Sequence, residues 1–131
     1  MTVLIDSWAW IEYWKGGKDA GRAAAHIEGA EEAVISVVNV AEVYFWVLKH
    51  YGDEVAAQKS KSMLRRSYTI VPDTEIATSA ARLKAEHRLG LADSFVLATA
   101  RSADAKVVTG DPDLKSFDDV VFIGSPEAEK K

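Results

Sequence analysis

Short hydrophobic runs alternate along the chain with longer segments in which hydrophobic residues recur at helical spacing. The short runs are rich in Val and Ile and are bounded by Gly, Pro, Asp or Asn, which is typical of buried strands. We expect strands at residues 2–5, 33–38, 68–71, 106–109 and 120–123. The segments between them predict helices at 7–15, 19–28, 39–51, 53–66, 74–88 and 91–104, and a short helix opening at 111.

This alternation predicts an α/β protein with three α/β/α layers and a central, mainly parallel sheet of four to five short strands. No repeat, low-complexity segment or internal linker interrupts the pattern. We therefore expect one domain over residues 1–124 and a polar C-terminal tail over residues 125–131.

Composition narrows the class of protein further. Of 131 residues, 48% are hydrophobic and 27% are charged, which is the balance of a soluble globular domain. The hydrophobic runs are far shorter than the roughly 18 residues that cross a bilayer, and the first residues lack the basic region of a signal peptide. Cysteine is absent, which excludes disulfides and thiolate metal ligands. We expect a cytoplasmic location and no membrane contact.

Four acidic residues, Asp6, Glu42, Asp93 and Asp111, lie where a predicted strand meets a helix or where a helix begins. Each has a structural explanation by itself, because carboxylates cap helix N-termini and favour the helix dipole there. In this interpretation Glu42 reaches back to Asn39 in a capping box, and Asp111 precedes a proline at the first helical position.

Their joint placement favours a metal site. Parallel strands bring the helix N-termini that follow them to one edge of the sheet, and several carboxylates gathered there would repel without a cation. Oxygen ligands without cysteine suit Mg²⁺ or Mn²⁺ rather than Zn²⁺. The three histidines, His26, His50 and His87, have no zinc-type spacing, and no glycine-rich phosphate loop follows the first strand.

The net charge of −4 is unusual for a protein that contacts nucleic acid. If the four acids face a metal, however, the rest of the chain is neutral, which is compatible with local contacts to RNA. Basic residues that could follow an RNA backbone, or simply form solvated helix faces, are Lys15, Lys18, Arg22, Lys49, Arg82 and Lys84.

Four segments occur in a characteristic order: VLIDSWAWIEYW, ISVVNVAEVYF, LGLADSFVLATA and KVVTGDPDL. Together they resemble the PIN-domain ribonucleases, and most closely the VapC-type toxins of prokaryotic toxin–antitoxin pairs. The resemblance covers nearly the whole domain and implies a PIN-like three-layer fold. It also implies a Mg²⁺- or Mn²⁺-dependent endoribonuclease in which activated water leaves a 5′-phosphate and a 3′-hydroxyl.

The same resemblance assigns roles to individual residues. It implies that Asp6, Glu42, Asp93 and Asp111 are the catalytic, metal-binding acids. Thr109 would orient a carboxylate or a water from beside them, and Asp113 would act through a water or serve as a first-turn helix acid. Ser7 is interpreted as an N-cap, and Gly110 as a position that varies in the family.

The resemblance further implies a homodimer and a small VapB-type antitoxin that binds beside the active site. An excess of aromatic residues on two predicted helices agrees with such interfaces: Trp8, Trp10, Tyr13 and Trp14 on one, and Tyr44, Phe45 and Trp46 on the other. Two alternatives stay open at this point. One is a PIN-type RNA-processing nuclease without an antitoxin, and the other is a non-catalytic binding module whose acids only cap helices.

Overall fold

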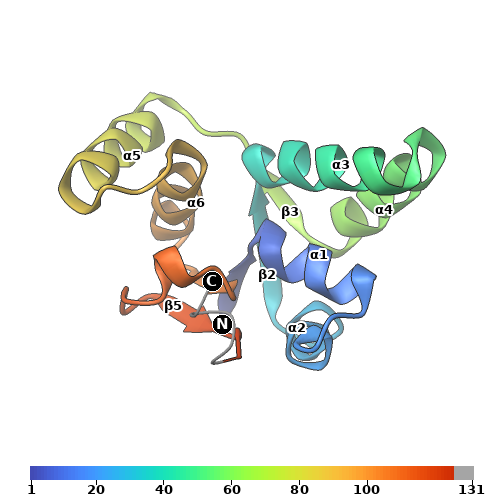
Figure 1. The fold of residues 1–131 in the computed structure, drawn as a ribbon. Coiled ribbons are helices and arrows are strands. Elements are labelled where there is room, and N and C mark those ends of the chain that lie inside the picture. Colours follow the sequence, from blue (N-terminus) through green and yellow to red (C-terminus); the bar gives the residue numbers. More distant parts are fainter. Residues whose placement is uncertain (126–131) are drawn as a thin grey trace.

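A computed structural model describes residues 1–125 and shows a five-stranded parallel sheet between two layers of helices (Figure 1). The strand order is β3–β2–β1–β4–β5, and every neighbouring pair is parallel. The strands are β1 (Thr2–Ile5), β2 (Glu32–Ser36), β3 (Tyr68–Ile70), β4 (Lys106–Thr109) and β5 (Val120–Phe122). The expected three-layer α/β/α fold is confirmed; the expected tail lies outside the described residues from 126 onward.

Helices cover both faces of the sheet, with α1 to α4 on one side and α5 and α6 on the other (Figure 1). Their bounds are α1 (Ser7–Lys15), α2 (Ala20–Ile27), α3 (Val37–Tyr51), α4 (Asp53–Arg66), α5 (Thr74–His87) and α6 (Leu91–Ser102). A 3-10 turn, η1 (Pro112–Leu114), follows β4. Across residues 1–125, the helices are too short or too polar to cross a membrane.

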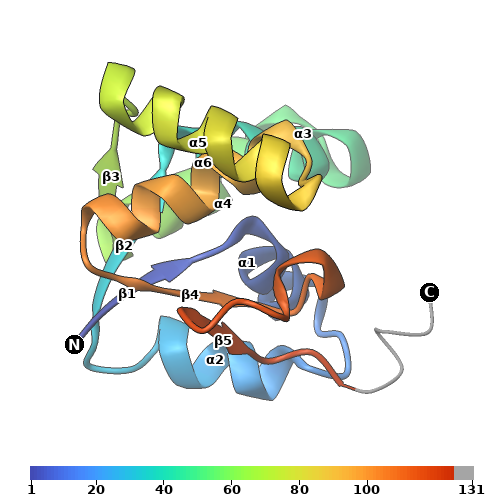
Figure 2. The ribbon, with the colours of Figure 1, turned by 90° about the vertical axis from the view of Figure 1, so that its left-hand side faces the viewer.

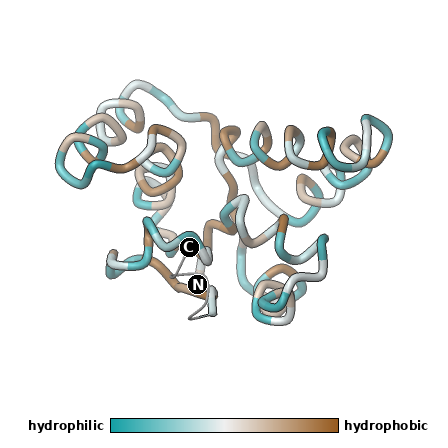
Figure 3. The backbone as a smooth tube through the Cα atoms, in the orientation of Figure 1, coloured by the Kyte–Doolittle hydropathy of each residue, from teal (hydrophilic) through white to brown (hydrophobic). Residues whose placement is uncertain are grey.

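The central strand β1 shows why the sheet is hydrophobic on both faces. Successive side chains of a strand point to opposite faces, so Val3 and Ile5 pack in the core under α1 to α4, whereas Leu4 packs under α5 and α6. All three side chains are fully buried. The hydropathy drawing shows this hydrophobic centre, with helices that alternate between hydrophobic and hydrophilic turns around it (Figure 3).

The boundary between β2 and α3 differs from the prediction. The run through Val38 was expected to be strand, but α3 begins at Val37, because Ser36 is its N-cap. The Ser36 hydroxyl accepts a hydrogen bond from the backbone N–H of Val38. The side-chain oxygen Oδ1 of Asn39 accepts one from the backbone N–H of Ser36. The predicted capping box between Asn39 and Glu42 is therefore wrong, since Asn39 is the third helical residue of a box that starts at Ser36.

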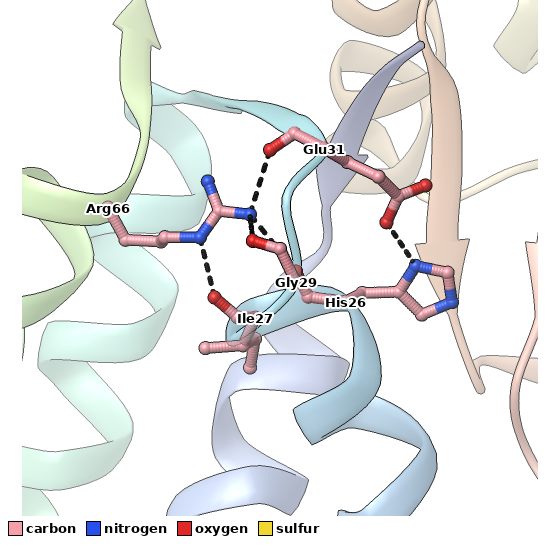
Figure 4. Close-up of polar contacts among 5 residues, drawn as sticks. All are labelled: His26, Ile27, Gly29, Glu31 and Arg66. Atoms are coloured by element: carbon pink, nitrogen blue, oxygen red, sulfur yellow. Dashed lines mark hydrogen bonds and ion pairs between the residues drawn. The ribbon is translucent and has the colours of Figure 1, made fainter.

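A single arginine side chain closes the loop between α2 and β2 (Figure 4). The Arg66 guanidinium, at the end of α4, donates hydrogen bonds to the backbone carbonyl oxygens of His26, Ile27, Gly29 and Glu31. The first two of these carbonyls belong to the last turn of α2, where helical partners are missing. Beside them the His26 ring contacts the Glu31 carboxylate at 2.8 Å.

We expect Arg66→Ala to lower the free energy of unfolding by about 2 kcal/mol, because hydrogen bonds from a charged donor to several carbonyls are lost together. Arg66→Lys should recover only part of this loss, since an ammonium lacks the planar fork of a guanidinium. Urea denaturation measures both effects. Arg65→Ala, at the exposed neighbouring position, is the matched control. An equal loss in the control would contradict the assigned role of Arg66.

Candidate metal centre

The candidate site lies at the carboxyl ends of β1 and β4, which are neighbours in the sheet although they are far apart in the sequence. The chain proceeds from β1 outward to β2 and β3 on one side, and then continues with β4 and β5 on the other. Ligands of open parallel sheets bind at such a switch in strand order. Figure 2 shows the segment that follows β4 next to α1, the helix that follows β1.

Asp6 follows β1 directly, and its carboxylate is held on both oxygens. Thr109 Oγ1 donates to Asp6 Oδ2 at 2.7 Å, and Asn39 Nδ2 donates to Asp6 Oδ1 at 3.1 Å. Thr109 Oγ1 in turn accepts a hydrogen bond from the N–H of Asp111 at 3.0 Å. Asp6 occupies the N-cap position of α1, but its side chain makes no capping hydrogen bond to that helix. The capping interpretation of Asp6 is therefore wrong.

Glu42 lies in the second turn of α3 and also caps nothing. Its Oε1 accepts a hydrogen bond from Ser7 Oγ at 2.8 Å, which joins α3 to the start of α1. The predicted role of Ser7 as an N-cap is wrong as well, because Ser7 is the first residue of α1 and its hydroxyl points to another element. Glu42 is thus oriented by a tertiary contact instead of by its own helix.

Asp93, Asp111 and Asp113 form the tightest group of acids among residues 1–125. One carboxylate oxygen from each lies within 4.8 Å of the other two. Asp93 is in the first turn of α6, and Asp111 caps η1 by accepting a hydrogen bond from the N–H of Asp113 at 3.0 Å. The expected cap at Asp111, followed by Pro112, is confirmed. Asp6 and Glu42 lie outside this tight group.

The pKa shifts of Asp6 and Asp93 nevertheless show that all four predicted acids interact electrostatically. Burial raises the pKa of Asp6 to about 6, and the charges of Glu42 and Asp111 add to the shift while the hydrogen bond from Thr109 opposes it. Burial raises the pKa of Asp93 to about 8, with contributions from Asp111, Asp6 and Glu42. The cost of these crowded carboxylates would fall if a divalent cation neutralised them. Carboxylate oxygens are the ligands that Mg²⁺ and Mn²⁺ prefer.

This crowding predicts how stability depends on pH without metal. Since the pKa of Asp93 is about 8 in the folded protein and near 3.8 in the unfolded chain, its stabilising contribution is complete below pH 3.8 and is lost as pH rises to about 8. With EDTA present, Asp93→Asn should therefore be more stable than the unaltered protein at pH 8, by about 1–3 kcal/mol. The two proteins should converge near pH 4.

Thermal denaturation between pH 4 and 8.5 measures this difference. Asp118→Asn, which removes an exposed carboxyl outside the acid cluster, is the control and should follow the unaltered protein at every pH. Manganese should raise the melting temperature of the unaltered protein more than that of Asp93→Asn. A constant offset between Asp93→Asn and the unaltered protein across the pH range would contradict the prediction.

Two features of the site were not anticipated from the sequence. The Asn39 side chain donates a hydrogen bond to Asp6 instead of starting its helix, and the Trp8 ring leaves no space for a side chain at Gly110. A Cβ atom at Gly110 would overlap the Trp8 indole of α1, so in this chain the residue at position 110, which varies in the family, is restricted to glycine by that contact. The pattern Ser-x-x-Asn at residues 36–39 carried a signal for the true helix start, whereas nothing local indicates the contact between Trp8 and Gly110.

The histidines and several basic residues have structural partners away from the acids. His26 contacts Glu31, the His50 ring stacks on Trp46 and the His87 ring packs against Phe117. No group of potential metal ligands within residues 1–125 includes a histidine. Arg22 donates to the carbonyl oxygens of Ile123 and Gly124, and Lys84 to that of Leu89. The expectation that the histidines are packing or surface residues is confirmed.

An open groove lies apart from the candidate site. It has a volume of about 1030 Å³, lies between α5, α6 and the end of β3, and contains none of the four acids. Its lining mixes both charges with small residues, for example Arg82, Glu86, Thr78 and Ala98. The candidate site is therefore identified by the convergence of carboxylates and not by the size of a cavity.

Comparisons with known proteins agree with this architecture. The family model described as PIN domain matches residues 3–120. No match is found among curated proteins. Among solved structures, a toxin–antitoxin complex from Klebsiella pneumoniae superposes with a TM-score of 0.76 at 24% identity, covering 91% of this chain and 95% of that chain.

Two further structures show the same fold. VapBC2 from Rickettsia felis, bound to a DNA fragment from its promoter, has a TM-score of 0.72 at 17% identity and covers 93% of this chain and 97% of that chain. VapC20 from Mycobacterium tuberculosis, described as a toxin that cleaves the sarcin–ricin loop, has a TM-score of 0.72 at 15% identity, with coverages of 90% and 98%.

Proposed function

Because this chain belongs to the PIN domain family, we propose that it is a Mg²⁺- or Mn²⁺-dependent endoribonuclease of the VapC toxin type. The observation that carries the proposal is the convergence of carboxylates at one edge of the sheet. Asp93, Asp111 and Asp113 present oxygens within 4.8 Å of one another, and the charges of Asp6 and Glu42 act on the same group. Helix capping explains Asp111 but neither Asp6 nor Glu42.

The donor set fits a hard divalent cation. Asp6, Glu42, Asp93 and Asp111 are the acids that would hold it, and Asp113 is close enough to contribute directly or through a water. Asn39 and Thr109 donate hydrogen bonds to different oxygens of Asp6, which fixes the orientation of its carboxylate. The raised pKa values of Asp6 and Asp93 reflect burial first and the charges of the neighbouring acids second, and both effects disfavour the carboxylates without a counter-charge.

Such a site would catalyse the hydrolysis of a phosphodiester by water. A Mg²⁺ or Mn²⁺ ion held by these acids would activate water and offset the charge of the phosphate. The protein supplies orientation: Thr109 and Asn39 hold the Asp6 carboxylate, and Ser7 holds that of Glu42. The products are a 5′-phosphate and a 3′-hydroxyl, because the nucleophile is water and no histidine lies among the acids to activate the RNA 2′-hydroxyl.

RNA is the proposed substrate, and an antitoxin and a second copy of the chain are the proposed partners. The similar structure from Mycobacterium tuberculosis is described as a toxin that cleaves the sarcin–ricin loop, and that from Klebsiella pneumoniae is a toxin–antitoxin complex. The surface offers a suitable interface. Along α3 the exposed hydrophobic residues Val37, Phe45, Leu48 and Tyr51 share one face of the helix, and Phe45 is 65% exposed. A cytoplasmic location follows from RNA as the target.

The proposed activity is tested by incubating the purified protein with total RNA in EDTA, Mg²⁺ or Mn²⁺ and sequencing the new RNA ends. We expect discrete cuts with ligatable 5′-phosphates, only when a divalent ion is present. Coexpression with the product of any small open reading frame directly upstream should give a complex that no longer cuts. Cuts that persist in EDTA, or that leave a 5′-hydroxyl, would rule out the proposed chemistry.

A further inference from the structure

The Asn39 side chain lies at the centre of the site and is fully buried. Its Nδ2 donates hydrogen bonds to Asp6 Oδ1 at 3.1 Å and to Ser7 Oγ at 2.9 Å, and its Oδ1 accepts one from the N–H of Ser36 at 2.9 Å. Both N–H groups of the amide and its oxygen are therefore used. A buried amide that satisfies all of these groups is held in one orientation.

The direction of each of these hydrogen bonds is determined. The backbone N–H of Ser36 can only donate, so the oxygen of the Asn39 amide must face it. Turning the amide over would place its NH₂ against that N–H and its oxygen against the Asp6 carboxylate. Because Nδ2 donates to Ser7 Oγ, the one proton of Ser7 is free to donate to Glu42 Oε1, at 2.8 Å.

We propose that Asn39 and Ser7 are positioning residues, which fix the carboxylates of Asp6 and Glu42 relative to each other through this directed chain of hydrogen bonds. This inference rests on the proposed nuclease function. Asp6 directly follows β1, whereas Glu42 lies on α3. Like charges at a shared site repel each other. Asn39 and Ser7 join them through neutral donors, which add no charge to the site.

A purely structural role must be separated from this one, because Asn39 also belongs to the capping box of α3. Ser36 provides the matched control. Ser36→Ala removes the hydrogen bond between the Ser36 hydroxyl and the N–H of Val38, and thus weakens the same helix start. It leaves the backbone N–H of Ser36 in place, so the contacts of Asn39 with Asp6 and Ser7 are retained.

The test compares four variants, Ser7→Ala, Ser7→Thr, Asn39→Ala and Ser36→Ala, with the unaltered protein. Three quantities are measured for each: the melting temperature, the Mn²⁺ dissociation constant from the spin-resonance signal of free Mn²⁺, and kcat and KM for a defined RNA. Loss of groups that orient metal ligands costs about 10- to 100-fold in metal affinity or activity.

We expect Asn39→Ala and Ser7→Ala to lose about 10- to 100-fold in Mn²⁺ affinity and in kcat, with KM for RNA little changed. Ser7→Thr keeps the hydroxyl and should restore most of the loss seen in Ser7→Ala. Ser36→Ala should lower the melting temperature while Mn²⁺ affinity and kcat stay at the level of the unaltered protein.

The inference is overturned if Ser7→Ala and Asn39→Ala bind Mn²⁺ and cleave RNA like the unaltered protein. It is equally overturned if Ser36→Ala loses as much Mn²⁺ affinity as Asn39→Ala, because the effect would then come from the helix start. If the unaltered protein itself neither binds Mn²⁺ nor cleaves RNA, the proposed function fails, and this inference falls with it. The two failures are thus distinguished by the unaltered protein alone.

Discussion

Replacing Asp6 by Asn is expected to lower RNA cleavage by on the order of 1000-fold or more, because the site loses a charge that the bound ion requires. Asp6 is the most buried of the four acids, at 4% exposure, and both of its oxygens are held by the protein. The replacement keeps the shape of the side chain, so the binding of RNA should change less than the cleavage rate. Initial rates in Mn²⁺ with a defined RNA measure this loss.

Without metal, Asp6→Asn and Asp93→Asn are expected to differ in stability. An amide at Asp6 removes a costly buried charge, but it turns an NH₂ group toward either Thr109 or Asn39, both of which donate in the unaltered protein. These opposite effects should leave its melting temperature without metal close to that of the unaltered protein. Asp118→Asn serves as the activity control. Cleavage by Asp6→Asn within about tenfold of the unaltered protein would exclude Asp6 from the metal site.

The second large effect is expected at Gly110. Its Cβ would overlap the indole of Trp8, which is a rigid ring attached to α1. We expect Gly110→Ala to lower the free energy of unfolding by about 2–3 kcal/mol, because the half-buried Trp8 ring, or α1 or β4 with it, must shift to make room. Since Asp6 precedes α1 and Asp111 follows Gly110, such a shift should also reduce Mn²⁺ affinity. Denaturation in urea and Mn²⁺ titration measure the two losses.

A double-mutant cycle isolates the contact between Trp8 and Gly110. Trp8→Ala alone leaves space where the indole lay, and in that background a methyl group at residue 110 meets no ring. Gly110→Ala should therefore cost little or nothing when it is combined with Trp8→Ala. If the two losses simply add, the steric explanation is wrong and the conformation of the Gly110 backbone has to account for the effect.

Hydrophobic runs and helix-ending residues were sufficient to predict most of the fold. The bounds of β1, β4, α1 and α4 agree with the predictions, because each is flanked by residues such as Asp6, Gly16, Gly52 or Gly110 that mark a change of backbone direction. The start of α3 was missed for an equally local reason. Val37 and Val38 prolong a β-branched run, and their strand propensity conceals the helix cap at Ser36.

The site was predictable in its acids but not in its connections. Parallel topology places Asp6, Glu42 and Asp111 at one edge of the sheet, and this can be reasoned from the order of strands and helices. The hydrogen bonds of Asn39 to Asp6 and of Ser7 to Glu42 join residues more than 30 positions apart. Neither spacing nor propensity carries information about such pairs. The predicted ligand roles of the four acids accordingly await the measurements above.

The order of strands in the sheet also has a consequence during synthesis on the ribosome. β4 is the fourth strand to be made, yet it lies beside β1, and Thr109 and Asp111 arrive with it. Until residues 106–113 have left the exit tunnel, Asp111 and Asp113 are missing from the group of acids and Asp6 lacks its hydrogen bond from Thr109. For a protein proposed to cut RNA, the nascent chain therefore lacks the assembled site until β4 has been made and has paired with β1.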